Sequence, residues 1–393
     1  SGVSIIHGNT EIVKYQNNQI AAHFKKFREE SKSVVSYLVK EFELRKNADQ
    51  MKRATVAKTG ELNMNRIFSY KFSEDIFKKV SVIPGGKSHG LVMYIDWSGS
   101  MMNYIHSTIE QLLNLVMFCK KINIPYEVYA FTSSYDAMYS GSGKPGEMHL
   151  GGFNLMNLLS SRMKTQEFAF ASGMLLNFSS RKVHVPDWLK LSGTPLNEAV
   201  VSSIYMVPEF KARNKLQIVN TVFLTDGDGN RKVTYTTPQG QYVDYRHMGN
   251  AMLVIRDPKT GHEETVDSNG SASQMTNAYM NLMKQRTQSN VVGFYILSGR
   301  DLHGAYVRSY GKVTDFEIES LKKEFRKNNY LIMENSGYDE YYLLRHEGFG
   351  DEDDDFEVDE DASMRSLAAA FVKYNMSRKT SRVILSRFIG LIS

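Results

Sequence analysis

The hydrophobic pattern of the chain changes character near residue 90. Before that point, residues 11–48 carry apolar positions at helical spacing among mixed charges, which predicts one long helix or two, packed on the outside of the main domain. Residues 49–89 show no clear period and are expected to be irregular. We therefore expect an N-terminal helical extension and lead-in over residues 1–89, followed by a main domain over residues 90–393.

From Leu91 onward, short apolar runs alternate with segments of helical period. This alternation is typical of a mostly parallel sheet with helices on both faces, so the expected fold class is α/β and doubly wound. Strands are expected at 91–96, 126–132, 217–225 and 291–298 and from about residue 329, and helices at 104–123, 194–207, 272–286 and 363–375.

Two stretches interrupt the alternation. Residues 133–192 are rich in Gly, Ser and Met and are too long for an ordinary connection. Residues 230–270 have the residue pattern of a β-hairpin insertion. Both follow strands whose carboxyl ends are expected at one edge of the sheet, and open α/β sheets bind ligands outside that edge.

The charge distribution and the cysteine content bear on the partners and the compartment of the protein. The net charge of +5 conceals an acidic loop, residues 351–361 (DEDDDFEVDED), which holds nine acidic and no basic residues and is expected to be a disordered loop or a contact for a basic patch. The basic remainder could attract nucleic acid, but no nucleic-acid-binding motif accompanies it, so that partner is not favoured. The single cysteine, Cys119, suits a reducing, cytoplasmic compartment, and no apolar run is long enough to predict a membrane partner.

Polar side chains follow three of the expected elements. Asp96, Ser98 and Ser100 end the first strand in DWSGS, SGTPL places Thr194 before a helix, and Asp226 follows the third strand in FLTDGDGN. In a parallel sheet these three loops share one rim. Their donors are all hard oxygens, which suits Mg²⁺ or Mn²⁺ and argues against zinc or copper. Because only two carboxylates are present, the ion is expected to take a further anion from outside.

The three motifs, in this order, resemble the metal-ion-dependent adhesion site (MIDAS) of the von Willebrand factor A (VWA) family. The resemblance implies a metal site of Asp96, Ser98, Ser100, Thr194 and Asp226. It implies that the two serines ligate the metal directly, that the threonine does so directly or through water, and that the last aspartate acts through water.

A closer likeness is to the VWA domain of the cobalt-chelatase subunit CobT. KTGELNMNRI (residues 58–67) resembles a segment that precedes the metal strand in that subfamily, and the long insertion before Thr194 also fits. Phage genomes encode relatives of this kind, so a phage origin in a host cytoplasm is expected. The likeness covers roughly residues 50–300. Trp97 stands where Asn is usual and is expected to place a large ring beside the site.

The resemblance implies adhesion rather than catalysis. In the family, the metal completes its shell with an Asp or Glu of a protein partner. CobT-type proteins work with a ring-shaped AAA+ ATPase of the MoxR kind, such as CobS. The expected function is therefore a Mg²⁺-dependent interaction subunit of a chelatase-like or remodelling complex, not catalytic alone.

Two other classes stay open: a metal-dependent hydrolase, and a structural or nucleic-acid-associated phage protein. Hydrolase motifs are incomplete. PGGKS lacks the first Gly of a phosphate loop, since Ser81 stands there, and Ser98 replaces the second Asp of a haloacid-dehalogenase-type phosphatase. HEETV (262–266) and HEGFG (346–350) lack the second His of a zinc peptidase.

Overall fold

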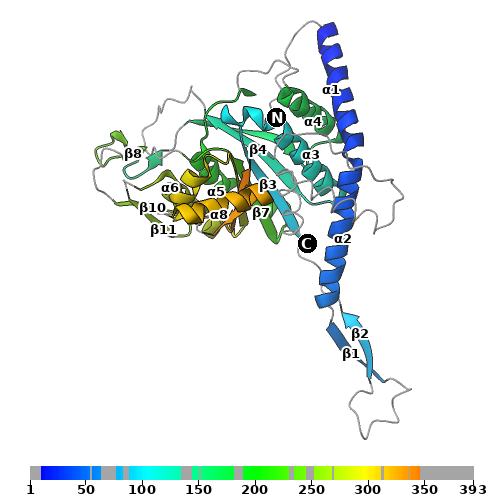
Figure 1. The fold of residues 1–393 in the computed structure, drawn as a ribbon. Coiled ribbons are helices and arrows are strands. Elements are labelled where there is room, and N and C mark those ends of the chain that lie inside the picture. Colours follow the sequence, from blue (N-terminus) through cyan, green and yellow to red (C-terminus); the bar gives the residue numbers. More distant parts are fainter. Residues whose placement is uncertain are drawn as a thin grey trace.

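A seven-stranded, mostly parallel sheet forms the centre of the computed structural model (Figure 1), in the order β13-β14-β12-β7-β3-β4-β6. The structure describes residues 10–53, 55–62, 77–82, 88–133, 144–149, 152–180, 189–229, 234–244, 252–267, 270–310, 314–334 and 336–345. The acidic loop 351–361 and the expected helix 363–375 lie outside these residues.

Five neighbouring strands are parallel, and the two edge strands are antiparallel to them. The parallel strands are β3 (His89–Asp96), β4 (Tyr126–Ser133), β7 (Ile218–Thr225), β12 (Asn290–Leu297) and β14 (Glu340–Arg345), and the edges are β6 (Phe153–Ser160) and β13 (Tyr330–Met333). All residues of β3, β7 and β12 except the first are buried, as expected for parallel strands covered on both faces. The predicted α/β class is confirmed.

The chain winds outward from β3 in two directions. It passes through β4 to β6 on one side, then returns to β7 on the other side of β3 and continues to β12 and β14. The strand order therefore reverses between β3 and β7. In doubly wound sheets, the crevice at such a reversal, outside the carboxyl ends of the strands, is where ligands bind.

Alternate residues of β3 enter two separate hydrophobic cores. Leu91, Met93 and Ile95 face one core and Val92 and Tyr94 the other, as the two-residue period of a strand requires. The first core lies under α3 (Ile105–Lys121) and α4 (Thr165–Ser179), the second under α5 (Leu196–Arg213) and α6 (Ala272–Thr287). A third, smaller cluster lies between the end of the sheet and two helices that the sequence did not predict, α7 (Leu302–Tyr310) and α8 (Asp315–Asn328).

The N-terminal segment forms two helices in line, α1 (Thr10–Glu30) and α2 (Lys32–Arg53), which run along the outside of α4 and α3 (Figure 1). Phe24, Phe27 and Leu38 belong to the same hydrophobic core as the sheet, so these helices are packed rather than loosely attached. The expectation of irregular structure over 49–89 was wrong in part. An antiparallel hairpin of β1 (Thr55–Leu62) and β2 (Phe77–Val82) lies beyond α2.

The two expected insertions differ in character. Residues 133–192 are not simply an insertion, because they supply the edge strand β6 and the core helix α4. Residues 230–270 do form hairpins, as predicted. The hairpins are β8 (Thr234–Thr236) with β9 (Tyr242–Asp244), which β5 (Met148–His149) joins, and β10 (Met252–Arg256) with β11 (Glu263–Asp267).

Candidate metal centre

The loops that follow β3 and precede α5 are joined by backbone hydrogen bonds. The amide of Gly99 donates to the carbonyl of Ser192 at 2.8 Å, and the amide of Ser192 donates to the carbonyl of Trp97 at 3.2 Å. Ser98 and Ser192 thus form a short parallel bridge that continues the sheet for one residue. Ser133, at the end of β4, donates its amide to the carbonyl of Gly193. The SGTPL loop is therefore held against the carboxyl ends of two strands.

Trp97 holds the segment that leads into the Thr194 loop, on the side of the sheet that α4 covers. Its ring is fully buried, stacks on Phe178 of α4 with 5.0 Å between ring centroids, and donates Nε1–H to the carbonyl of Leu189 at 2.8 Å. The expectation that this ring lies beside the site was wrong. Trp97 continues the row of Leu91, Met93 and Ile95 into the first core. Its role is to anchor the chain that leads into the Thr194 loop.

Asp96 forms the buried floor of the site. Its side chain is fully buried, and Oδ2 accepts a 2.6 Å hydrogen bond from the hydroxyl of Thr225. Oδ1 is also buried and makes no hydrogen bond within 3.5 Å among the described residues. Ser98 and the backbone amide of Asp226 nevertheless lie near enough to the carboxyl group to lower its pKa. A buried carboxylate oxygen with so little hydrogen bonding is free to accept a ligand.

Ser98, Ser100 and Asp226 form a hydrogen-bonded group beside Asp96. The hydroxyls of Ser98 and Ser100 are 3.0 Å apart. Both reach Oδ1 of Asp226, at 3.4 Å from Ser98 and 2.8 Å from Ser100. Ser98 is buried whereas Ser100 is exposed, so the group of oxygen donors runs from the interior to the surface.

Thr194 enters from the third loop. A Cβ added to Gly227 would lie 3.2 Å from both the hydroxyl oxygen and the methyl carbon of Thr194, which shows how closely this side chain packs on the residue after Asp226. The structure therefore joins Ser98, Ser100 and Asp226 by hydrogen bonds beside Asp96, and it packs Thr194 against Gly227, the residue that follows Asp226. These loops lie at the point where the strand order reverses.

Thr225 was missed in the sequence. Besides its bond to Asp96, its hydroxyl accepts from the amide of Gly227 at 3.0 Å and lies 2.9 Å from the carbonyl oxygen of Gly227. The signal lay in the strand register: Ile95 pairs with Leu224, so Asp96 and Thr225 are the next neighbours across β3 and β7.

The pKa values of both carboxyl groups, Asp96 and Asp226, are raised, as expected where no positive charge of a described residue lies nearby. Burial raises the pKa of Asp96 to about 7; the hydrogen bond from Thr225 opposes this rise, whereas the nearby Asp226 carboxylate adds to it. Burial also raises the pKa of Asp226, against hydrogen bonds from Ser100 and Ser98. A divalent cation would favour the ionised form of both groups.

The donor set fits Mg²⁺ or Mn²⁺ better than a softer metal. Within the described ranges, no three or more His, Cys, Asp or Glu side chains gather in a way that could hold a metal ion. The candidate centre instead combines two carboxylates with hydroxyls, which are ligands for a hard cation that keeps part of its water shell. The buried, weakly hydrogen-bonded Oδ1 of Asp96 is consistent with this assignment.

Comparisons with known proteins give structural likenesses of low similarity. No protein-family model and no curated protein matches the chain. A crystal structure of the pilus adhesin SpaC from Lactobacillus rhamnosus GG, in an open conformation, is 14% identical, covers 78% of this chain and 31% of that chain, and has a TM-score of 0.33. A second form of SpaC is 16% identical, covers 77% and 31%, and has a TM-score of 0.35.

A third likeness is to the human COPII-coat protein Sec24c, at 8% identity, 67% and 30% coverage, and a TM-score of 0.27. The chain thus spans less than a third of the length of these structures. Similarities at this level do not assign the chain to a family. None of the helices in the described part of the chain is long and apolar enough to cross a membrane.

Proposed function

We propose that this chain is a Mg²⁺-dependent protein-interaction subunit whose metal centre binds an acidic side chain of a partner. The observation that carries the proposal is the fully buried Asp96 carboxyl group, whose Oδ1 makes no hydrogen bond within 3.5 Å among the described residues and beside which Ser98 and the Asp226 carboxylate lie. A bound cation would explain why a carboxylate oxygen at this position is buried without a close hydrogen bond.

Each residue has a distinct role in the proposal. Ser98 and Ser100 would hold the ion directly, Thr194 directly or through water, and Asp226 through water, while Asp96 and Asp226 would supply negative charge. Such an ion would supply an electrophilic centre that attracts a carboxylate of the partner.

The surface around the centre suits a protein partner. Ser100 is exposed and begins the short 3₁₀ helix η2 (Ser100–Asn103), on which the side chain of Met102 is 46% exposed. An exposed, adaptable apolar side chain beside a charged centre provides contact area for a partner that also offers a carboxylate.

We propose further that the chain acts as an ancillary, CobT-like subunit of a chelatase-like or remodelling complex. In this proposal its partner is a MoxR-type AAA+ ATPase in the cytoplasm, and the chain is phage-encoded. This finer proposal rests on the DWSGS, SGTPL and TDG motifs and on KTGELNMNRI. Neither hydrolase nor nucleic-acid chemistry gains support from a described side chain at this site.

The metal is tested by titrating Mg²⁺ into the purified chain and recording heat of binding and thermal shift. Asp96→Asn and Ser98→Ala should abolish or strongly weaken both signals, whereas Asp315→Asn, an exposed carboxylate on α8, should leave them unchanged. Equal binding by wild type and Asp96→Asn would remove the metal from the proposal.

The partner is tested by pull-down of a candidate MoxR-type ATPase with and without EDTA. We expect retention that is lost with EDTA and with Asp96→Asn. Undiminished retention in both conditions would show an interaction that does not pass through the metal.

A further inference from the structure

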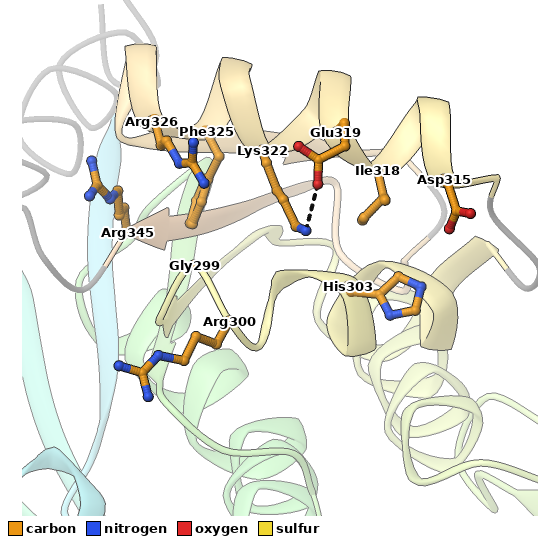
Figure 2. Close-up of a pocket in the computed structure, with 10 residues that line it drawn as sticks. All are labelled: Gly299, Arg300, His303, Asp315, Ile318, Glu319, Lys322, Phe325, Arg326 and Arg345. Atoms are coloured by element: carbon orange, nitrogen blue, oxygen red, sulfur yellow. Dashed lines mark hydrogen bonds and ion pairs between the residues drawn. The ribbon is translucent and has the colours of Figure 1, made fainter.

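A second feature lies at the same sheet edge, away from the metal centre: a pocket of about 690 Å³ beneath α8 (Figure 2). We call it the α8 pocket. It lies where β12 and β14 end, since Gly299 and Arg300 follow β12 and Arg345 is the last residue of β14. The helix contributes one face, with lining side chains spaced three and four residues apart from Asp315 to Arg326.

The α8 pocket is basic at one end. Lys322 pairs with Glu319 at 2.8 Å, so these two charges offset each other. The lining also holds Arg300, Arg326 and Arg345, with Asp315 as the other carboxylate. Figure 2 shows the three arginines toward one end and Asp315 with His303 toward the other.

Two of these arginines are available for a ligand. Within the part of the chain that the structure describes, neither Arg300 nor Arg326 forms an ion pair with a carboxylate, and both are exposed. Arg345 reaches Oδ1 of Asn329 at 3.4 Å. Guanidinium groups bind carboxylates through paired N–H donors in a fixed geometry.

The placement of the arginines favours an extended acidic ligand. One follows β12, one lies on α8 and one ends β14, so they are carried by three separate elements around an open pocket. Carboxylates spaced along an extended peptide can each form an ion pair with a different arginine of this group. The chain itself contains a segment of this chemistry, the acidic run 351–361 with nine acidic residues.

We propose that the α8 pocket binds the chain's own acidic run, residues 351–361. Arg345 lies in the wall of the pocket, and only residues 346–350 separate it from Asp351. Six Cα steps span at most roughly 20 Å, so the run begins close to the pocket that Arg345 lines. A tether this short gives an effective concentration on the order of millimolar, enough to populate a weak electrostatic contact.

The experiment uses a fluorescent peptide with the sequence of residues 350–362 and two versions of the full chain. One is wild type. In the other, the neutralised chain, the first part of the run carries Asp351→Asn, Glu352→Gln, Asp353→Asn, Asp354→Asn and Asp355→Asn. If the run occupies the pocket in cis, the peptide binds the neutralised chain at least about tenfold more tightly than wild type, because its internal competitor is gone.

Matched charge reversals locate the contact. In the neutralised chain, the double variant Arg300→Glu with Arg326→Glu should reduce peptide affinity about tenfold or more. The control is Lys323→Glu with Lys327→Glu, two residues on α8 outside the pocket lining. It changes the net charge by the same amount and should reduce peptide affinity only about twofold. The milder pair Arg300→Gln and Arg326→Gln should give an intermediate loss, and circular dichroism checks the fold of each variant.

Three results would overturn the proposal. The first is equal affinity of the peptide for wild type and for the neutralised chain. The second is an equal loss of peptide affinity from the lysine and the arginine reversals. The third is binding of inorganic polyphosphate by a chain that does not bind the peptide. A salt-sensitive dimer of wild type in sedimentation would likewise count against occupancy in cis, since the run would then bind a second copy.

Discussion

The hydroxyl of Thr225 donates a 2.6 Å hydrogen bond to Oδ2 of Asp96, across two strands where the order of the sheet reverses. This bond leaves Oδ1 as the carboxylate oxygen of Asp96 that makes no hydrogen bond within 3.5 Å among the described residues. Thr225 is therefore a positioning residue. It holds the carboxylate in one orientation and does so from a neighbouring strand.

Thr225→Val tests this role, since valine keeps the shape and removes the donor. The hydrogen bond lowers the pKa of Asp96, so its loss should raise that pKa further and weaken Mg²⁺ binding. Folding stability should fall by about 1–2 kcal/mol. Thr225→Ser retains the hydroxyl and should retain most of the Mg²⁺ affinity in calorimetry. Equal affinities for the valine and serine variants would contradict the role.

The response to Mg²⁺ should depend on pH. A carboxyl group whose pKa is raised on folding contributes stability that is present below its unfolded pKa, near 4, and lost as the pH rises through its folded pKa. For Asp96 that folded pKa is about 7, so ionisation at neutral pH costs folding free energy that a bound cation would offset.

We therefore expect Mg²⁺ affinity to be about tenfold weaker at pH 6 than at pH 8, because a proton then competes for the Asp96 carboxylate. Thermal shift at a fixed, sub-saturating Mg²⁺ concentration checks this. Asp96→Asn should show no such dependence. An affinity that is flat between pH 6 and pH 8 in wild type would be inconsistent with ionisation of Asp96 as the controlling step.

Gly227 controls the position of Thr194. A methyl group at Gly227 would lie 3.2 Å from both Oγ1 and the methyl carbon of Thr194, closer than an ordinary contact, so the Gly227→Ala variant must displace the threonine. We expect weaker Mg²⁺ binding with a change in stability within about 1 kcal/mol. Gly99→Ala is the matched control, because its nearest neighbour, the carbonyl oxygen of Ser192, lies at 3.9 Å. Calorimetry of both variants should separate them.

Gly173 sets the distance between α4 and α1. A Cβ there would lie 2.6 Å from the backbone oxygen of Ile20. Within a helix, Gly→Ala ordinarily stabilises by about 0.5–1 kcal/mol. Here it should instead destabilise by about 1–3 kcal/mol, because backbone must move. Urea denaturation and limited proteolysis of α1 test this. A gain in stability would mean that α1 does not depend on this contact.

Four strands of the centre and the edge strand β13 were predictable, whereas the edge strand β6 and the parallel strand β14 were not. β3, β4, β7 and β12 form continuous apolar runs in the sequence because parallel strands are buried on both faces. The edge strand β6 is only partly buried over its first half and lies in a stretch rich in Gly, Ser and Met, so it lacked that signal. α8 was missed since only Ile318 and Phe325 of its residues are buried, which leaves a weak hydrophobic stripe.

The site shows the same division. The motifs identified the three loops, because the residue types and their order carry the information. The partner of Asp96 depends on register between strands that are distant in sequence, which no local pattern reveals. The burial of Trp97 follows from the two-residue period of its strand, which places it in the row of Leu91, Met93 and Ile95.

The backbone pairing of Ser192 with Trp97 and Gly99 has a mechanical consequence. The two loops cannot slide independently without breaking that pairing, so a pull on the rim is transferred to the Trp97 ring. That ring is stacked on Phe178 of α4, and α4 is in tight contact with α1 through Gly173 and Ile20. Contiguous contacts thus connect the loops at the sheet edge with the N-terminal helix α1.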